Sequence, residues 1–330
     1  MAPDGWEAVT LAGARQIGTW MAACLCILWP MFSHAKSIAL VYNKEQAVFV
    51  QFAEALAEPL ATQGHTLTLI HLTDYLPATS DRKQAFDLTL IAGNEALQVV
   101  RAMPPNTPIW AMLVSREAYQ QSLQALQRGH AQVSAIYHDP PPFRQLALAQ
   151  RLQPGIRQVG YLYGPAHADE AQMLSQAAEK LGLSVVAMPV STTADLPATL
   201  ISVLQRSDVL LANADPQIYN SQTIKTILTA AYRQDKTLIG SSPAFVKAGS
   251  LATTYTPIHQ IVDEVLRFTS RWQNGHAVQL PLAHYPSDFE VLVKTDVAHS
   301  LGLNTPGVDE LKRQIQLIEQ QNRFNAGAQP

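Results

Sequence analysis

Short runs of aliphatic and β-branched residues alternate with segments of helical spacing along most of the chain. The first run, Ser37–Tyr42, has the composition of a buried strand. Phe49, Phe52 and Leu56 then recur every three to four residues, which predicts an amphipathic helix. Gly64 stands where a glycine commonly ends such a helix. The opening of the chain is therefore predicted to be a strand followed by a helix.

The same alternation continues to the end of the sequence. Further strands are predicted at residues 67–71, 88–92, 109–114, 131–137, 158–163, 184–188, 208–212, 236–240, 251–254 and 289–294. Helical patterns cover residues 174–181, 196–206, 218–234 and 258–272, a short stretch before 301–303, and a last helix from Val308 that is expected to fray beyond Arg323. Alternating strands and helices predict an α/β protein whose parallel sheets carry helices on both faces.

Three consecutive prolines, Pro140 to Pro142, interrupt the pattern after the fifth predicted strand. Such a run cannot continue a helix or a central strand, so it predicts a stiff connector between two lobes. The strand–helix pattern restarts at Gln158. We therefore expect two doubly wound parallel-sheet lobes joined by a hinge. Ligands of open α/β sheets bind at the carboxyl ends of the strands, so the expected site is a cleft between the lobes.

Residues 20–32 form an apolar, uncharged run that is too short to span a membrane. The run is typical of a secretory signal peptide, with cleavage expected after Ala35. Asp4 and Glu7 depart from this interpretation, because a basic region is typical there. A buried N-terminal helix, or a lipoprotein anchored at Cys24, are the alternatives. Export would place the protein in the periplasm.

Composition excludes several classes of protein. The 330 residues are 47% hydrophobic and 15% charged, so general disorder is excluded. The net charge of −3 leaves no basic excess for binding nucleic acid. Cys24 and Cys26 are the only cysteines and form neither a disulfide framework nor a metal site by their spacing. No later run approaches 18 apolar residues, so we expect a soluble mature protein.

Motifs of enzyme chemistry are absent from the sequence. No glycine-rich nucleotide loop, P-loop or nucleophile elbow follows a predicted strand. The histidines do not have the spacing of a common metal-binding motif. We therefore predict no catalytic residue, no metal ligand and no cofactor, and a binding protein is favoured over an enzyme.

Polar residues at strand ends are the candidate ligand contacts. Asp215 follows a strand and could accept hydrogen bonds from a ligand amine or hydroxyl, cap the next helix, or do both. Asn43 and Asn94 follow two strands of the first lobe, where capping is favoured over ligand binding. Asp139 could contact ligand, although fixing the proline connector is favoured.

Aromatic and hydroxyl side chains extend this set of candidates. Tyr219 and Tyr255 could form an aromatic wall for a ring-shaped or apolar ligand, although packing in the core is favoured for both. Ser241 and Ser242 precede a predicted helix that starts at Pro243. Backbone N–H groups there could hold a carboxylate, and simple capping is the alternative.

An ordered set of segments resembles the ABC-transporter substrate-binding protein family between about residues 37 and 306. The segments are RQVGYLYG at 157–164, PFRQL at 142–146 with LQPG at 152–155, AA at 177–178 with LGL at 181–183, DVLLA at 208–212 with Asp215, FVKAGSLA at 245–252, and VKTDVA at 293–298 with LGLNTP at 301–306. The loops at 42–45, 137–141 and 217–220 depart from the family's forms. Because these loops determine which ligand is bound, the resemblance does not identify the ligand.

The resemblance implies a periplasmic-binding-protein fold of type I that binds without chemistry. It implies a first lobe of residues 36–138 and 256–290, a second lobe of 139–255, and a C-terminal part, 291–330, that crosses the hinge. The implied partners are a small polar ligand, for which an amino acid is one suggestion, and an ABC permease of the inner membrane. We expect a monomer. A periplasmic sensor that presents its closed state to a receptor, and a two-lobed transferase, remain alternatives.

Overall fold

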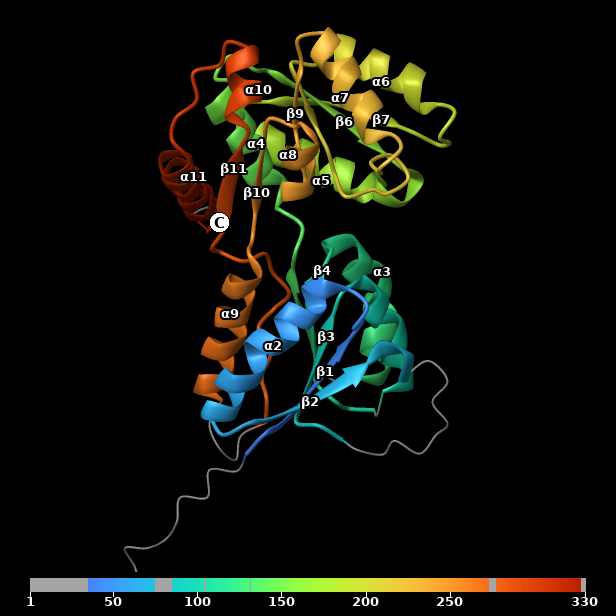
Figure 1. Ribbon diagram of the computed structural model, residues 1–330, viewed down its shortest axis with the longest axis vertical. Helices are drawn as coiled ribbons and strands as arrows, with labels where there is room; N and C mark the ends of the chain where they lie inside the picture. Colours follow the sequence, from blue (N-terminus) through green and yellow to red (C-terminus); the bar gives the residue numbers. More distant parts are fainter. Residues whose placement is uncertain (1–34, 75–84, 104, 131, 273–276, 328–330) are drawn as a thin grey trace, which may run out of the picture. The chain divides into compact units, whose positions relative to one another are not determined.

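The strands form two separate sheets, one of five strands and one of six (Figure 1). The computed structural model describes residues 35–74, 85–103, 105–130, 132–272 and 277–327. The predicted leader and its two cysteines lie outside these described residues. Residues 36–330 make up a single unit. The prediction of an α/β protein with two sheet-containing lobes is confirmed.

The first sheet is entirely parallel, with the strand order β2-β1-β3-β4-β5. Its strands are β1 (Ser37–Tyr42), β2 (Thr66–His71), β3 (Leu88–Ala92), β4 (Ile109–Val114) and β5 (Val133–Tyr137). Every residue of β3 and β4 is buried. Strands that are apolar on both faces need a covering layer on each side, and this is why the sheet carries two layers of helices.

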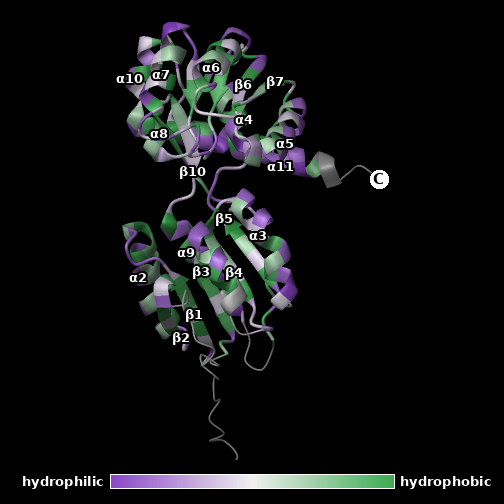
Figure 2. Cartoon of the chain, turned by 90° about the vertical axis from the view of Figure 1, so that its right-hand side faces the viewer, coloured by the Kyte–Doolittle hydropathy of each residue, from purple (hydrophilic) through white to green (hydrophobic). Residues whose placement is uncertain are grey.

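Two helices cover each face of the first sheet. On one face, α2 (Ala47–Thr62) and α9 (Ile258–Arg271) contact each other and pack over residues such as Leu40 and Leu90. On the other face, the 3-10 helix η2 (Asn94–Ala102) and α3 (Arg116–Gly129) pack over the intervening strand residues. Side chains alternate between the faces of a strand, so each strand contributes to both cores. Figure 2 shows these strands as the hydrophobic centre of the lobe.

The second sheet has the strand order β11-β10-β9-β8-β6-β7. Its strands are β6 (Gln158–Tyr163), β7 (Ser184–Pro189), β8 (Val209–Leu211), β9 (Thr237–Ile239), β10 (Ala252–Tyr255) and β11 (Glu290–Val293). All pairs are parallel except β10 with β11, so the expectation of parallel pairing is wrong at this edge. The chain leaves β10 at its carboxyl end, builds α9 over the first sheet, and returns from that same end. The returning strand must therefore run in the opposite direction.

Helices also cover both faces of the second sheet. One layer contains α4 (Pro142–Leu152), α5 (Ala168–Glu179), α10 (Thr295–Ser300) and α11 (Val308–Gly327). The other contains α6 (Leu196–Gln205) and α7 (Ile224–Arg233). The short helix α8 (Pro243–Ala248) joins β9 to β10. Each lobe is therefore a three-layer sandwich with two hydrophobic cores.

The chain passes between the two sheets at three places. It crosses after β5, after β10, and in the segment before β11. The last crossing segment is tied to β5, because the Tyr137 amide donates to the His284 carbonyl at 2.9 Å and the His284 amide donates to the Ala135 carbonyl at 3.0 Å. These hydrogen bonds fix the crossing segment to the edge of the first sheet.

Local details differ from the predicted elements at several points. The proline run is a connector only as far as Pro141, because Pro142 begins α4, where its missing N–H is not needed. Helix α3 was not predicted, although Ser115 caps it through the Ala118 amide. Helix α7 begins six residues later than expected, since Asn220 and Thr223 form a turn before it. Helix α11 continues past Arg323 to Gly327. Within the described ranges, no helix is both long enough and apolar enough to cross a membrane.

Candidate functional site

Asp215 joins the carboxyl ends of two neighbouring strands in the second sheet. Its Oδ2 atom accepts from the Gly164 amide at 3.0 Å, just after β6, and Oδ1 accepts from the Gln217 amide at 2.8 Å, just after β8. The residue is only 2% exposed. A Cβ atom at position 164 would lie 2.5 Å from Oδ2, so this close approach requires glycine. Asp215 therefore caps the turn that follows it and does not cap α7, whose N-cap is Thr223.

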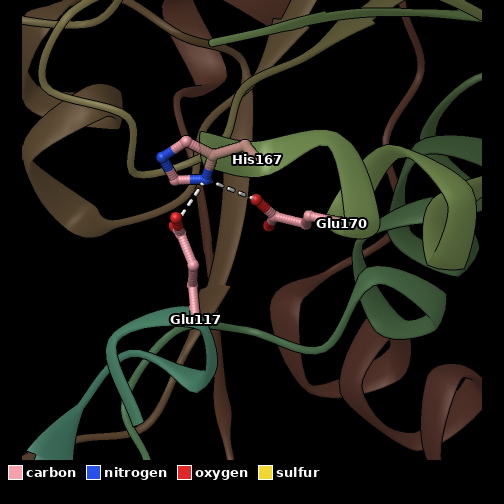
Figure 3. A group of neighbouring side chains, drawn as sticks. All are labelled: Glu117, His167 and Glu170. Atoms are coloured by element: carbon pink, nitrogen blue, oxygen red, sulfur yellow. Dashed lines mark hydrogen bonds and ion pairs between the residues drawn. The ribbon is translucent and has the colours of Figure 1, made fainter. Parts of the chain in front are cut away.

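A histidine and two glutamates meet beside Asp215 (Figure 3). Nδ1 of His167, from the 3-10 helix η3 (Pro165–His167), lies 2.6 Å from Glu117 of α3 and 3.0 Å from Glu170 of α5. Its Nε2 lies 3.6 Å from Oδ2 of Asp215. Glu117 belongs to the layer over the first sheet, and the other three residues belong to the second. The histidine therefore connects loops of both sheets.

The surrounding carboxylates hold His167 in its protonated form. Burial alone would lower the pKa of this imidazole, but the hydrogen bonds that it donates to Glu117 and Glu170 and the charges of Glu117 and Asp215 outweigh burial. The net effect raises the pKa of His167 to about 10. Glu117, His167 and Glu170 also place one ligand atom each within 4.8 Å of one another, and carboxylate and imidazole are donors that divalent cations accept. One imidazolium faces three carboxylates, those of Glu117, Glu170 and Asp215, so the group keeps an excess of negative charge.

The protonated histidine predicts a pH-dependent stability. We expect His167→Gln to lower the free energy of unfolding by about 2 kcal/mol near pH 6, the range for hydrogen bonds to charged groups. Because the folded pKa lies above the unfolded value of about 6.5, this contribution is complete below that value and is lost as the pH rises toward about 10. Urea unfolding of the wild type and of His167→Gln, at several pH values across this range, measures the difference in the free energy of unfolding.

The exposed His299 of α10 provides the matched control for this prediction. His299→Gln should leave the free energy of unfolding within about 0.5 kcal/mol of the wild type across the same pH range. A His167→Gln deficit that is equal at both ends of the pH range would contradict an imidazolium role. It would indicate that the side chain contributes by packing alone.

Two tyrosines and an asparagine line the neighbouring strand ends. The Asn213 side-chain amide donates to the Tyr161 hydroxyl at 2.9 Å, and the Ser241 hydroxyl donates to the Asn213 carbonyl at 3.1 Å. Tyr219 is 7% exposed and packs on Phe245, with ring centroids 5.7 Å apart. Its hydroxyl has no hydrogen-bond partner in the described part of the chain. Burial raises the pKa of Tyr219, and the charges of Asp215 and Glu170 raise it further, so the hydroxyl stays protonated beside them.

Polar side chains also link the strand ends of the first sheet. Asn43 donates to Glu95 at 3.0 Å and accepts from the Glu45 amide at 3.0 Å. Asn94 accepts from the Ser115 amide at 2.9 Å and donates to the Ser115 hydroxyl at 3.3 Å. Both asparagines therefore hold loops at the carboxyl edge of the sheet, and a role as ligand contacts stays a prediction.

Asp139 lies in the segment that leads from the first sheet to the second. Its Oδ1 atom accepts from the Arg116 amide at 2.8 Å, which ties the connector to the start of α3. Burial raises the pKa of Asp139 to about 7, the charge of Glu170 adds to the rise, and the Arg116 hydrogen bond opposes it. The carboxyl group can therefore change its charge near neutral pH.

The remaining predicted residues lie apart from this group. Ser242 is the N-cap of α8, but its side chain makes no capping hydrogen bond. Tyr255 ends β10 opposite Glu290 and is partly buried. Among the described residues, no hydrogen bond joins either side chain to the other candidates. The structure thus joins Asp215 and Ser241 to Asn213 by hydrogen bonds, and Tyr219 to Asp215 through its backbone amide.

Sequence reasoning missed the histidine–glutamate group. Glu117 and His167 are 50 positions apart, and neither belongs to a spacing motif. Only the placement of His167 directly after a strand and Gly164-Pro165 could have marked it as a strand-end residue. Its partner could not have been chosen, because many glutamates begin helices near strand ends.

Comparisons with known proteins agree with this architecture. Three similar solved structures are a conserved domain protein from Vibrio cholerae, an ABC domain in complex with L-Trp from Streptococcus pneumoniae, and the ligand-free, open structure of a substrate binding protein with adhesive properties from Clostridium difficile. Their sequence identities are 18%, 17% and 16%, and their TM-scores 0.59, 0.56 and 0.65. The matches cover 84%, 82% and 83% of this chain and 98%, 96% and 97% of theirs.

At these identities the solved structures establish the fold alone. A search of curated proteins returns no match. A family model described as ABC transporter substrate binding protein matches residues 126–307, which is more than half of the chain. This range contains His167, the Asp215 loop and both crossings into the second lobe, and Glu117 lies before it. The chain belongs to the ABC transporter substrate-binding protein family.

Proposed function

We propose that this protein is exported, captures a small polar molecule between its two lobes, and delivers it unchanged to an ABC importer. The proposal rests on the Asp215 group, by which we mean Asp215, His167, Glu170 and Glu117. In this group the strand-end loops of the second sheet meet Glu117 from the layer over the first. A ligand held by both sets of loops would favour the arrangement in which they meet, and this links ligand affinity to closure.

The charges of the group favour a ligand that carries an ammonium. Asp215, Glu170 and Glu117 lie around one protonated histidine, and Asp139 lies close enough to Glu170 for its pKa to respond. The Tyr219 hydroxyl, which has no partner within the described residues, supplies a further polar contact. An ammonium donates three hydrogen bonds and would balance the excess carboxylates. We therefore infer that the ligand is a small amine-bearing molecule such as an amino acid.

Fold similarity is consistent with this ligand size, because the neighbour from Streptococcus pneumoniae holds L-Trp. For this chain, Asp215, Asn43, Asn94, Asp139, Tyr219 and Ser241 are proposed to lie nearest the ligand. Lobe boundaries near residues 138 and 256 are proposed at the first two crossings. The apolar run at residues 20–32 is proposed to direct export to the periplasm, with cleavage near Ala35.

Ligand identification tests this function directly. The full-length gene is expressed with its leader, the protein is purified from the periplasmic fraction without dialysis, and the denatured sample is analysed by mass spectrometry. We expect a mature N-terminus near Lys36 and a stoichiometric amine-bearing small molecule. Isothermal titration of the stripped protein with that molecule should give binding without product formation.

Three results would contradict the proposal at different points. A chain that keeps its leader and stays in the cytoplasm would remove export. A chemically altered ligand after incubation would make the protein an enzyme. A released ligand without an amine, together with no binding of amino acids, would remove the inferred ligand class.

A further inference from the structure

A cavity of about 830 Å³ lies where the chain crosses between the two sheets, lined by residues of several elements. Arg116 and Gln120 of α3 and Arg267 of α9 reach it from the helices over the first sheet. Arg144 of α4 and Arg323 of α11 reach it from the helices over the second. We call it the crossover cavity. Both lobes therefore contribute to its lining.

Positive charge exceeds negative charge in the crossover cavity. Four arginines line it, against two glutamates, Glu264 and Glu319. Glu319 pairs with the buried Arg144 at 2.9 Å and lies 3.9 Å from Arg323. Glu264 is 2.5 Å from His284, and this hydrogen bond raises the pKa of the imidazole. Both glutamates are therefore already engaged by other groups.

Two of the four arginines form no ion pair within the described residues, although the charge of Asp139 acts on Arg116. Among the residues that the structure describes, no carboxylate oxygen lies within 4.0 Å of the guanidinium of Arg116 or of Arg267. Arg116 is half-buried. Unbalanced charge in a concave, partly desolvated place concentrates a positive potential and attracts anions.

The other polar groups of the lining are mainly donors. Tyr137 and Tyr285 pack edge to face, with ring centroids 4.9 Å apart. Burial raises the pKa of each phenol, so both hydroxyls keep their protons at neutral pH. Gln120 and Ser287 add an amide and a hydroxyl. Such a lining offers hydrogen bonds to an acceptor-rich ligand.

We propose that the crossover cavity binds a small oxyanion, a carboxylate or phosphate group, paired with the guanidiniums of Arg116 and Arg267. The planar fork of an arginine donates two parallel hydrogen bonds to the oxygens of such a group. The site differs in charge from the acidic Asp215 group, although α3 contributes to both, with Arg116 in the cavity and Glu117 in the Asp215 group. Both guanidiniums belong to helices over the first sheet, so the anion is anchored to the first lobe.

The test is a titration of the full chain with inorganic phosphate and, separately, with citrate. Ionic strength is held constant with chloride, which also serves as the weakly binding reference anion. We expect isothermal titration to detect saturable binding of at least one oxyanion, with a rise in Tm that follows occupancy. Arg116→Gln/Arg267→Gln should weaken that binding by about tenfold or more, the effect of losing one or two charge-assisted hydrogen bonds.

The matched control is Arg128→Gln/Arg233→Gln, which removes two exposed arginines from the last turns of α3 and α7. It has the same net charge as the test variant and should bind within about threefold of the wild type, because general charge effects are equal. Should the double variant fail to fold, the single Arg267→Gln, whose side chain is exposed, takes its place.

Equal affinity in the test and control variants would overturn the proposal, as would the absence of saturable binding by either oxyanion. Binding of phosphate but not citrate would indicate a phosphate group as the bound oxyanion, and binding of citrate but not phosphate would indicate a carboxylate. The amine-bearing ligand of the Asp215 site is titrated in parallel. The test variant should keep some affinity for it, and a complete loss in step with the oxyanion would mean that the cavity is part of that site rather than a second one. Failure of the oxyanion titration with intact amine binding would leave the proposed function standing.

Discussion

Replacing Glu319 by alanine is expected to lower the free energy of unfolding by about 3–5 kcal/mol. Arg144 is 2% exposed and donates from Nε to Glu319 at 2.9 Å and from Nη2 at 3.2 Å. Its guanidinium also donates to the Pro286 carbonyl at 3.0 Å and lies 4.0 Å from the centre of the Phe289 ring. Removing the carboxylate leaves a buried positive charge without a counter-charge. Burial lowers the pKa of Arg144 while Glu319 opposes this, so the same change also weakens the charged form.

Urea unfolding with an unchanged m-value measures the loss. Glu310→Ala is the matched control, because Glu310 lies on the same helix and pairs with Arg313 at an exposed site. An exposed pair contributes about 0–1 kcal/mol, so this control should lose no more than that. Replacing the buried pair together, as Arg144→Met/Glu319→Leu, should recover most of the loss. Equal losses in Glu319→Ala and Glu310→Ala would contradict the role assigned to burial.

The Arg144–Glu319 pair also helps to hold α11 against α4 of the second lobe. The helix comes last in the chain, yet Leu311 and Ile315 lie in the core beside α4, and Glu319 adds the ion pair one turn further on. Arg144 contacts the last crossing segment through Pro286. One guanidinium thus links a helix of the second lobe, the C-terminal helix and the segment that joins the sheets.

Most elements of the fold could be predicted because each depends on nearby residues. The apolar run Ile109–Val114 and the amphipathic spacing of Phe49, Phe52 and Leu56 are local signals, and both elements lie where the pattern places them. The antiparallel pairing of β10 with β11 could not be predicted in this way. Its direction depends on the route of the chain through α9, which no local pattern records.

The site was predictable only where a strand end coincides with a polar residue. Asp215 satisfies that rule, and its carboxylate does join two strand ends. His167 and Glu117 meet only because the two lobes are arranged as they are, so no spacing in the sequence reveals the pair. The Arg144–Glu319 pair spans 175 positions and is hidden for the same reason. Ligand contacts that depend on two lobes are in general less visible than the cores of either lobe.

Replacing Asp215 by asparagine is expected to weaken binding of the proposed amine-bearing ligand by about 100-fold or more, which corresponds to about 2.7 kcal/mol. Both carboxylate oxygens accept backbone hydrogen bonds, from the Gly164 and Gln217 amides. An asparagine keeps one acceptor and turns an N–H donor toward the other amide. The change therefore removes the negative charge that would pair with the ligand ammonium, and it also displaces the loop after β6.

Asp208 provides a control on the same two strands. Its Oδ2 atom accepts from the Arg157 and Gln158 amides at 2.7 and 2.8 Å, so it ties β6 to β8 at their amino ends as Asp215 ties them at their carboxyl ends. Asp208→Asn should lose a similar amount of stability, about 1–3 kcal/mol, while its affinity stays within about threefold of the wild type. The two variants separate stability from recognition, because only one end of the strands faces the other lobe. If both variants lost affinity equally, the ligand would not bind at the carboxyl ends of these strands beside Asp215, as expected for an open α/β sheet.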